Sequence, residues 1–171
     1  GFSAAAARAE AVKEGESRCF GRHTVQFIMA PMVHWPEVMV SFDTTDGVLF
    51  SADAFGSFNA LDGRLFADEV NFACDWLDET RRYYANIVGK YGPQVLMLLK
   101  KVSALDVKVI CPLHGLVWRR DIPYIVEKHR LWASYQPEEK AVCIFYGSMY
   151  GDTENAAQLL AVKLAERGVT N

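Results

Sequence analysis

The chain has 171 residues, 51% of them hydrophobic and 12% aromatic, which is typical of a folded globular protein. Its formal net charge of −3 gives no reason to expect a nucleic-acid or anionic-membrane partner. No apolar stretch approaches the roughly 20 residues that a membrane-spanning helix needs. Composition therefore excludes a membrane-spanning class and disfavours nucleic-acid binding.

The four cysteines are scattered and form no CxxC pair. This spacing argues against a cysteine-ligated zinc site, a rubredoxin-type iron centre and a disulfide framework. The opening residues also lack the basic region and apolar core of a secretory signal. We therefore expect a cytoplasmic protein.

Three β-rich segments come first. Residues 23–29 alternate between apolar and polar side chains, and residues 37–43 and 47–53 flank a turn with an Asp-Gly pair. This arrangement predicts a hairpin or meander. The next segment, residues 54–73, is irregular and carries Gly, Asn and Asp among aromatics. Irregular segments of this length are often functional loops.

Helices and one buried strand follow. Apolar spacing predicts a helix over about 75–88, and Pro93 begins another that runs to about residue 104. Residues 106–115 are expected to form a short buried strand that continues into a loop. A further helix is predicted over 121–134, with Asp121 as its N-cap.

The pattern changes at residues 134–140, a polar segment with a proline that we interpret as a linker. Residues 141–147 are continuously apolar, which favours a buried strand of the parallel type. Residues 153–167 have the spacing of an amphipathic helix. We therefore expect two domains, over 1–136 and 137–171.

Three candidate metal ligands each follow a predicted strand: His34, Asp53 and His114. Side chains at strand ends on one edge of a sheet converge, so they can share a metal site. Imidazole and carboxylate together suit zinc, iron or manganese, and a carboxylate can bridge two ions. The alternative is structural, with hydrogen-bonded core histidines and a loop aspartate. His114 fits that alternative least, because Pro112 and Gly115 fix its backbone.

A second candidate site lies between the apolar segment 141–147 and the last helix. A hydroxyl- and glycine-rich loop at a helix N-terminus binds anions through backbone N–H groups and the helix dipole. The candidate residues are Ser148, Met149, Tyr150, Gly151, Asp152 and Thr153. No lysine follows as in a nucleoside-triphosphate loop. The alternative is a helix cap without a ligand.

Several segments carry a family resemblance: MVHWPE, SADAFG and CPLHG, and then WRRDIPYIVEKHRLWASYQPEEKAVCIFY. In this order they resemble flavodiiron proteins (A-type flavoproteins), from about Val12 to Asn171. The resemblance implies an α/β fold. It would comprise the C-terminal half of a metallo-β-lactamase-like αββα sandwich, then the first β-loop-α unit of a flavodoxin-like doubly wound domain.

The resemblance also implies two cofactors, a diiron centre and FMN. His34 would bind one iron, Asp53 would bridge both irons, and His114 would bind the other. The loop from Ser148 to Thr153 resembles the FMN-phosphate loop of flavodoxins, where Asp152 would have to point its carboxylate outward. Such proteins reduce dioxygen to water or nitric oxide to nitrous oxide, with electrons passing from FMN to the irons.

The implied partners are an electron donor, such as rubredoxin or a flavin or F420 reductase system, and a second copy. In the family a head-to-tail homodimer, or a dimer of dimers, brings one subunit's FMN beside the partner's irons, where Trp35 could line the approach or simply pack. The family's H-x-E-x-D-H ligand cluster does not occur in this sequence. We therefore expect an internal part of a longer protein. The alternatives are a zinc-dependent hydrolase and a catalytically inert fragment.

Overall fold

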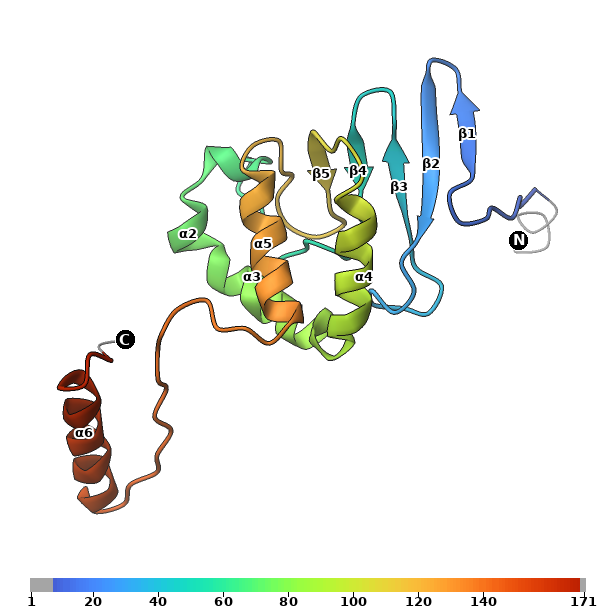
Figure 1. Ribbon diagram of the computed structural model, residues 1–171. Coiled ribbons are helices and arrows are strands. Elements are labelled where there is room, and N and C mark those ends of the chain that lie inside the picture. The colour runs from blue at the N-terminus through green and yellow to red at the C-terminus, as the bar shows by residue number, and fades with distance from the viewer. Residues whose placement is uncertain (1–7, 170–171) are drawn as a thin grey trace. The chain divides into compact units, whose positions relative to one another are not determined.

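The computed structural model describes residues 8–169. They fall into two compact units, and the boundary in the sequence lies between Tyr135 and Gln136. The elements of the N-terminal unit are β1 (Ser17–Phe20), β2 (His23–Met29), β3 (Met39–Asp43), β4 (Val48–Phe50), η1 (Ala67–Glu69), α2 (Phe72–Asp75), α3 (Leu77–Tyr83), the π-helical η2 (Tyr84–Val88), η3 (Gly89–Tyr91), α4 (Gly92–Val102), β5 (Val109–Cys111) and α5 (Ile122–Ala133) (Figure 1). The C-terminal unit contains α6 (Asp152–Ala165).

The strands form one sheet in the order β1-β2-β3-β4-β5 (Figure 1). Strands β1 to β4 are antiparallel neighbours, whereas β4 and β5 are parallel. The predicted meander is confirmed, and its turn is closed by Gly47, whose N–H donates to the carbonyl of Asp43 at 2.9 Å. The short edge strand β1 was not predicted, and all of its residues are exposed. The α/β class is confirmed.

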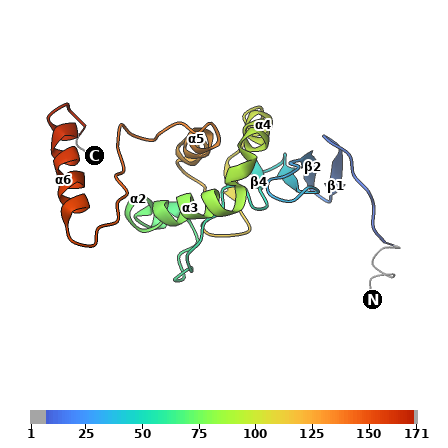
Figure 2. The same cartoon turned by 90° about the horizontal axis from the view of Figure 1, so that it is seen from below.

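One face of the sheet forms the core. Alternate strand positions are buried, at Ile28, Val40, Phe42, Leu49 and Ile110. They belong to one apolar cluster with the buried side of α4 and with Ile125 of α5. Figures 1 and 2 show α4 and α5 on the same face of the sheet. The pleat turns the paired residues Phe27, Ser41, Phe50 and Cys111 to the other face, where they are partly or fully exposed.

The helices differ from the predictions at two places. The helix expected over about 75–88 is divided into α2, α3 and the π-helical η2. Asp121 directly precedes α5, as predicted, but its side chain makes no capping hydrogen bond. Its backbone has a left-handed φ of 52°, whereas an N-cap residue normally has extended geometry. Asp121 therefore occupies the predicted N-cap position, but its side chain does not cap the helix.

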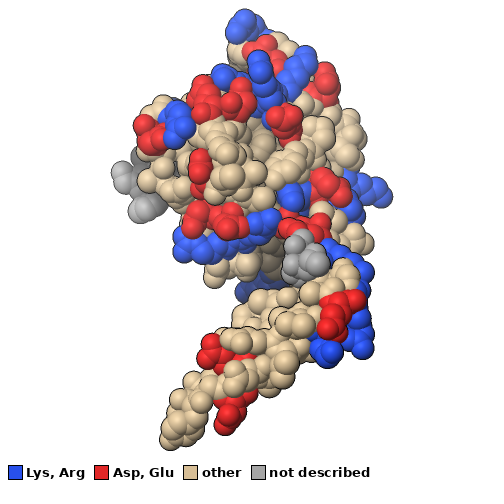
Figure 3. All heavy atoms as spheres, turned by 90° about the vertical axis from the view of Figure 1, so that its left-hand side faces the viewer, with Lys and Arg blue, Asp and Glu red and all other residues tan. Residues whose placement is uncertain are grey.

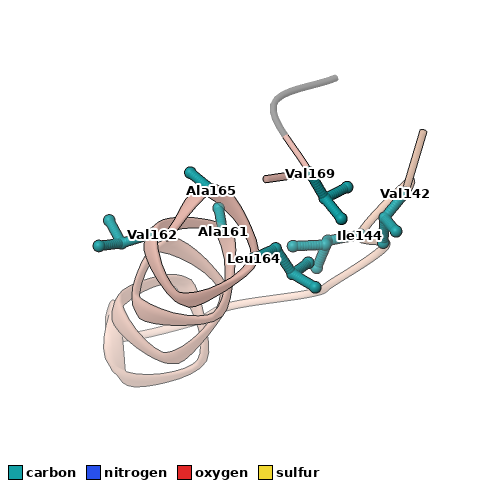
Figure 4. Close-up of a pocket in the computed structure, with 7 residues that line it drawn as sticks. All are labelled: Val142, Ile144, Ala161, Val162, Leu164, Ala165 and Val169. Atoms are coloured by element: carbon teal, nitrogen blue, oxygen red, sulfur yellow. The ribbon is translucent and has the colours of Figure 1, made fainter. Parts of the chain in front are cut away.

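The C-terminal unit consists of an extended segment and α6. Residues 141–147 were predicted to form a buried strand, but they have no strand partner among residues 8–169 and most are exposed. A strand requires a neighbour for its backbone N–H and C=O groups, so this prediction is wrong for the described structure. Figure 4 shows Val142 and Ile144 turned toward Leu164 and Val169 around a cavity of about 340 Å³. Two apolar side chains of this segment therefore line a hollow together with residues of α6.

Charged side chains of both signs lie close together over much of the face shown in Figure 3. Exposed pairs one helical turn apart, such as Arg130–Glu127 at 2.7 Å, occur on α3, α5 and α6. Such exposed pairs contribute little to stability, because solvent screens the charges. Among the described residues, no helix is long and apolar enough to cross a membrane.

His129 of α5 is buried within an aromatic enclosure. Its ring lies 4.8 Å from that of Phe55, 5.5 Å from that of Tyr84 and 5.1 Å from that of Trp132. Burial lowers the pKa of His129 to about 4, although Nδ1 lies 3.0 Å from the carbonyl of Ile125. The imidazole is therefore neutral at pH 7, and Nδ1–H donates to that carbonyl.

This burial predicts acid sensitivity. In the unfolded chain His129 takes up its proton near pH 6.5, but in the folded chain only near pH 4, so the unfolded state binds more protons between these values. The contribution of His129 to stability is complete above pH 6.5 and is lost as the pH falls toward 4. The expected total is about 3 kcal/mol. Urea unfolding between pH 7 and 4 measures it, and His129→Leu should flatten the profile. An equally steep profile in that variant would contradict the prediction.

Candidate metal centre

Three loops meet at one edge of the sheet because of its topology. β2 and β4 are both antiparallel to β3, and β5 is parallel to β4, so β2, β4 and β5 run in the same direction. Their C-terminal ends therefore lie at the same edge. The loop after β2 carries His34, the turn after β4 carries Asp53, and the loop after β5 carries His114.

Backbone hydrogen bonds extend this arrangement beyond the ends of β4 and β5. Ser51 N–H donates to the carbonyl of Cys111 at 3.1 Å, and Leu113 N–H donates to that of Ala52 at 2.8 Å. The buried hydroxyl of Ser51 donates to the carbonyl of Ala54 at 2.8 Å and closes the turn that holds Asp53. The loops that carry Asp53 and His114 are thus joined through main-chain atoms.

The three predicted ligands are brought together. His34 Nε2 lies 3.6 Å from Asp53 Oδ2, and His114 Nε2 lies 3.4 Å from Asp53 Oδ1. Each oxygen of the carboxylate therefore faces a different imidazole. Both separations exceed an ordinary hydrogen bond, and they are compatible with an ion bound to N and O at about 2.1 Å from each. The side chain of Asp53 is 16% exposed, whereas that of His114 is 57% exposed.

The donor set favours two ions over one. Among the described residues, the one group of three whose ligand atoms all lie within 4.8 Å of each other is His23, Asp43 and Asp46. His34, Asp53 and His114 do not converge on a single point, because Asp53 presents a different oxygen to each histidine. A bridging carboxylate has this geometry, so the three residues fit a pair of metal ions.

The group around His23 is explained by hydrogen bonds of the imidazole and by the ion pair of Arg22 with Asp46 at 3.9 Å. His23 Nδ1 lies 2.7 Å from Asp43 Oδ2, and Arg22 Nε donates to His23 Nε2 at 3.0 Å. Since Nε2 accepts from Arg22, the proton of the imidazole is on Nδ1, where it is donated to Asp43. Both ring nitrogens thus have partners, and this group stabilises the hairpin.

Tyr83 also belongs to the site, although no sequence pattern predicted it. Its side chain is buried, and its hydroxyl lies 3.5 Å from Asp53 Oδ1. Its ring centroid lies 5.7 Å from that of His114. Burial and the charge of Asp53 raise the pKa of Tyr83 well above its usual value. The phenol therefore keeps its proton and directs it at the carboxylate. In the sequence, nothing distinguishes Tyr83 from a packing tyrosine on a helix.

Trp35 lies beside the site with its ring edge-on to His34, at a centroid separation of 6.1 Å. Its exposed fraction is 58%, so more than half of its surface is accessible. Leu113, next to His114, is also exposed. Two exposed apolar side chains thus flank the two histidines.

The loop between residues 148 and 153 begins α6. Gly151 N–H donates to Ser148 Oγ at 3.0 Å, and Gly151 precedes the first helical residue, Asp152. Met149 and Tyr150 are largely exposed. The Ser148 hydroxyl thus shapes a loop at the positive end of a 14-residue helix. Its residues form one loop, but no described contact shows a ligand role for them.

Gly56 lies in the loop after Asp53 and packs directly against Tyr83. A Cβ at Gly56 would lie 2.7 Å from two atoms of the Tyr83 ring. We expect Gly56→Ala to displace this ring and to lower the free energy of unfolding by about 1–3 kcal/mol. Urea unfolding measures the loss. Gly56→Ala should cost less stability when it is added to Tyr83→Leu than when it is added to the wild type, because the smaller side chain leaves room for the new Cβ. Additive losses would show that the ring is not the source.

Comparisons with known proteins agree with this fold. Residues 2–115 match the model of the ODP family beta lactamase. The chain is 38% identical over 158 residues to the anaerobic nitric oxide reductase flavorubredoxin of Aeromonas hydrophila, covering 91% of this chain and 31% of that protein. It is 37% identical to the rubredoxin-oxygen oxidoreductase of Megalodesulfovibrio gigas, with coverages of 94% and 40%.

Solved structures give the same result. The crystal structure of the flavodiiron protein from Giardia intestinalis superposes with a TM-score of 0.83 at 30% identity, covering 92% of this chain and 38% of that one. The chain thus spans about 30–40% of the length of these relatives. The chain belongs to the ODP beta-lactamase family, in the form found in flavodiiron proteins.

Proposed function

We propose that this chain contributes three ligands of a diiron centre and the phosphate loop of an FMN site to an oxidoreductase that reduces dioxygen to water or nitric oxide to nitrous oxide. The relatives support this class of reaction, because one is named a nitric oxide reductase flavorubredoxin and another a rubredoxin-oxygen oxidoreductase. These names also favour the oxidoreductase over a zinc-dependent hydrolase.

The observation that carries the proposal is the position of Asp53 between His34 and His114. Its two oxygens face the two imidazoles at 3.6 Å and 3.4 Å. In this assignment His34 would hold one iron, His114 would hold the other, and Asp53 would contribute a carboxylate oxygen to each. When bound, two ferrous ions supply electrons and a shared binding place for a diatomic substrate.

The chain's own residues prepare this site in three ways. Tyr83 directs its hydroxyl at Asp53 and can hold a proton there. Its buried ring packs against that of Phe58, with the ring centroids 5.1 Å apart, and this contact holds the phenol beside the carboxylate. His34 and His114 remain partly exposed, so their Nε2 atoms are accessible to ions and to further ligands.

We assign residues 1–136 to the diiron domain and residues 137–171 to the beginning of the FMN-binding domain. The division between compact units at Tyr135 and the family match over residues 2–115 support this assignment. The proposed phosphate contacts are the N–H and hydroxyl groups of Ser148, Met149, Tyr150, Gly151, Asp152 and Thr153. Asp152 would contribute its N–H only, since its carboxylate would repel a phosphate.

The proposed partners follow from this electron path. A rubredoxin-type protein, or a flavin or F420 reductase system, would reduce the FMN, and the name of the relative from Megalodesulfovibrio gigas supports a rubredoxin-type donor. FMN of one subunit would deliver electrons to the irons of its partner in a head-to-tail homodimer, in the cytoplasm. The exposed Trp35 beside His34 supports an approach at this edge of the site.

Removal of one histidine tests the metal assignment. We expect the metal-free chain to bind ferrous iron under anaerobic conditions, and His114→Ala to weaken binding at least about tenfold, because a ligand is lost. Equilibrium dialysis with colorimetric iron analysis gives iron per chain and affinity. His23→Ala is the matched control, since His23 lies in the ion-paired hairpin. Wild-type affinity in His114→Ala would contradict the assignment, and no binding by the wild type would favour an inert chain.

The phosphate loop is tested by nuclear magnetic resonance. We expect FMN to shift the amide resonances of residues 148–153, whereas riboflavin, which lacks the phosphate, should not. Ser148→Ala should reduce the shifts, because the Gly151 N–H loses the acceptor that shapes the loop. Gln158→Ala, farther along α6, is the control. Equal shifts with riboflavin would exclude phosphate recognition at this loop.

A further inference from the structure

His114 lies on a loop and its side chain is more than half exposed, so packing around the imidazole does little to fix its position. The main chain of His114 is held more firmly. Its carbonyl accepts the N–H of Ser57 at 3.2 Å, from the loop that follows Asp53. The position of His114 relative to Asp53 therefore depends on how well Ser57 is held.

Ser57 is buried, with an exposed fraction of 5%, and it contacts the His114 loop at a second point. A Cβ at Gly115 would lie 2.8 Å from the Ser57 Cβ, and Gly115 has a left-handed φ of 86°. Only glycine combines this backbone conformation with so close an approach. The loop at 114–115 and Ser57 therefore form a tight backbone contact that any shift of Ser57 would transmit to His114.

Thr80 of α3 holds Ser57 from the other side. Its exposed fraction is 1%, and its hydroxyl oxygen lies 3.1 Å from Ser57 Oγ and 2.8 Å from the carbonyl of Trp76. Ser57 Oγ in turn lies 2.7 Å from the carbonyl of Phe58. Ser57 O–H donates to the Phe58 carbonyl, and the single Thr80 O–H is shared between the Trp76 carbonyl and Ser57 Oγ. These contacts link the loop to the helix.

Thr80 and Tyr83 are three residues apart on α3 and therefore project from the same side of the helix. Thr80 contacts Ser57, which holds the backbone of His114, whereas Tyr83 contacts the carboxylate of Asp53. A single helix turn thus reaches both residues of the Asp53–His114 pair. The helix, which is a rigid element, therefore fixes the distance between Asp53 and His114, although both residues lie in loops.

We propose that Thr80 and Ser57 are positioning residues that hold His114 at coordinating distance from Asp53. They act through the backbone of His114 and touch neither metal nor substrate. The importance of this role rests on the metal function proposed above, but the positioning itself is a property of the metal-free chain. It can therefore be tested separately.

The first measurement is made without metal. In the wild type, ring protons of Tyr83 and His114 should give nuclear Overhauser effects, because their centroids are 5.7 Å apart. Thr80→Val keeps the shape of the side chain but loses the hydroxyl, so we expect these signals to weaken severalfold. Thr80→Ser keeps the hydroxyl and should restore them. Thr44→Val, in the exposed turn after β3, is the matched control. Unchanged signals in Thr80→Val would overturn the proposal.

The second measurement uses ferrous iron as the probe. Thr80→Val should weaken iron binding by about tenfold, as loss of supporting groups around metal ligands typically does. Thr80→Ser should bind like the wild type. A variant that loses stability but keeps both the ring signals and the affinity would show that Thr80 only supports the fold. If the wild type binds no iron but Thr80→Val still loses the ring signals, the positioning stands and the metal function fails.

Discussion

The site depends on one constraint, the common direction of β2, β4 and β5. Because these strands run the same way, three loops that are distant in the sequence end at one edge of the sheet. The hydrogen bonds of the β4–β5 ladder continue into the loops through Ser51 and Leu113. Main-chain geometry therefore fixes the backbone positions of Asp53 and His114. Side-chain contacts then adjust the orientation of the two ligands.

The chemistry of the site is set by one largely buried carboxylate. Asp53 is surrounded by polar atoms, with an imidazole facing each oxygen and the Tyr83 hydroxyl at one of them. A carboxylate in this position needs compensation, and cations bound between it and the imidazoles would supply it. The same contacts explain why α3 matters to a site located on loops: it carries Tyr83 and Thr80 side by side.

In the C-terminal unit, a strand-like sequence pattern does not produce a strand. Residues 141–147 have the composition of a buried strand, yet their backbone has no ladder partner among the described residues. Val142 and Ile144 line a hollow together with residues of α6, and Leu159, Leu160 and Val162 of the helix are exposed. The hydrophobic pattern of a segment determines which of its side chains can be buried. Backbone hydrogen bonds to another strand determine whether the segment becomes part of a sheet.

The sequence by itself predicted most elements of the N-terminal unit, the meander and the three candidate ligands, because periodicity, turn residues and strand ends are local signals. It also indicated the loop at the start of α6. Only the tertiary structure decided which oxygen of Asp53 faces which histidine, and that Tyr83, Ser57 and Thr80 support them. Tyr83 and Asp53 are 30 positions apart, and no periodicity relates a helix residue to a carboxylate across that separation. Such contacts arise from the packing of α3 against the loops, which the whole core determines together.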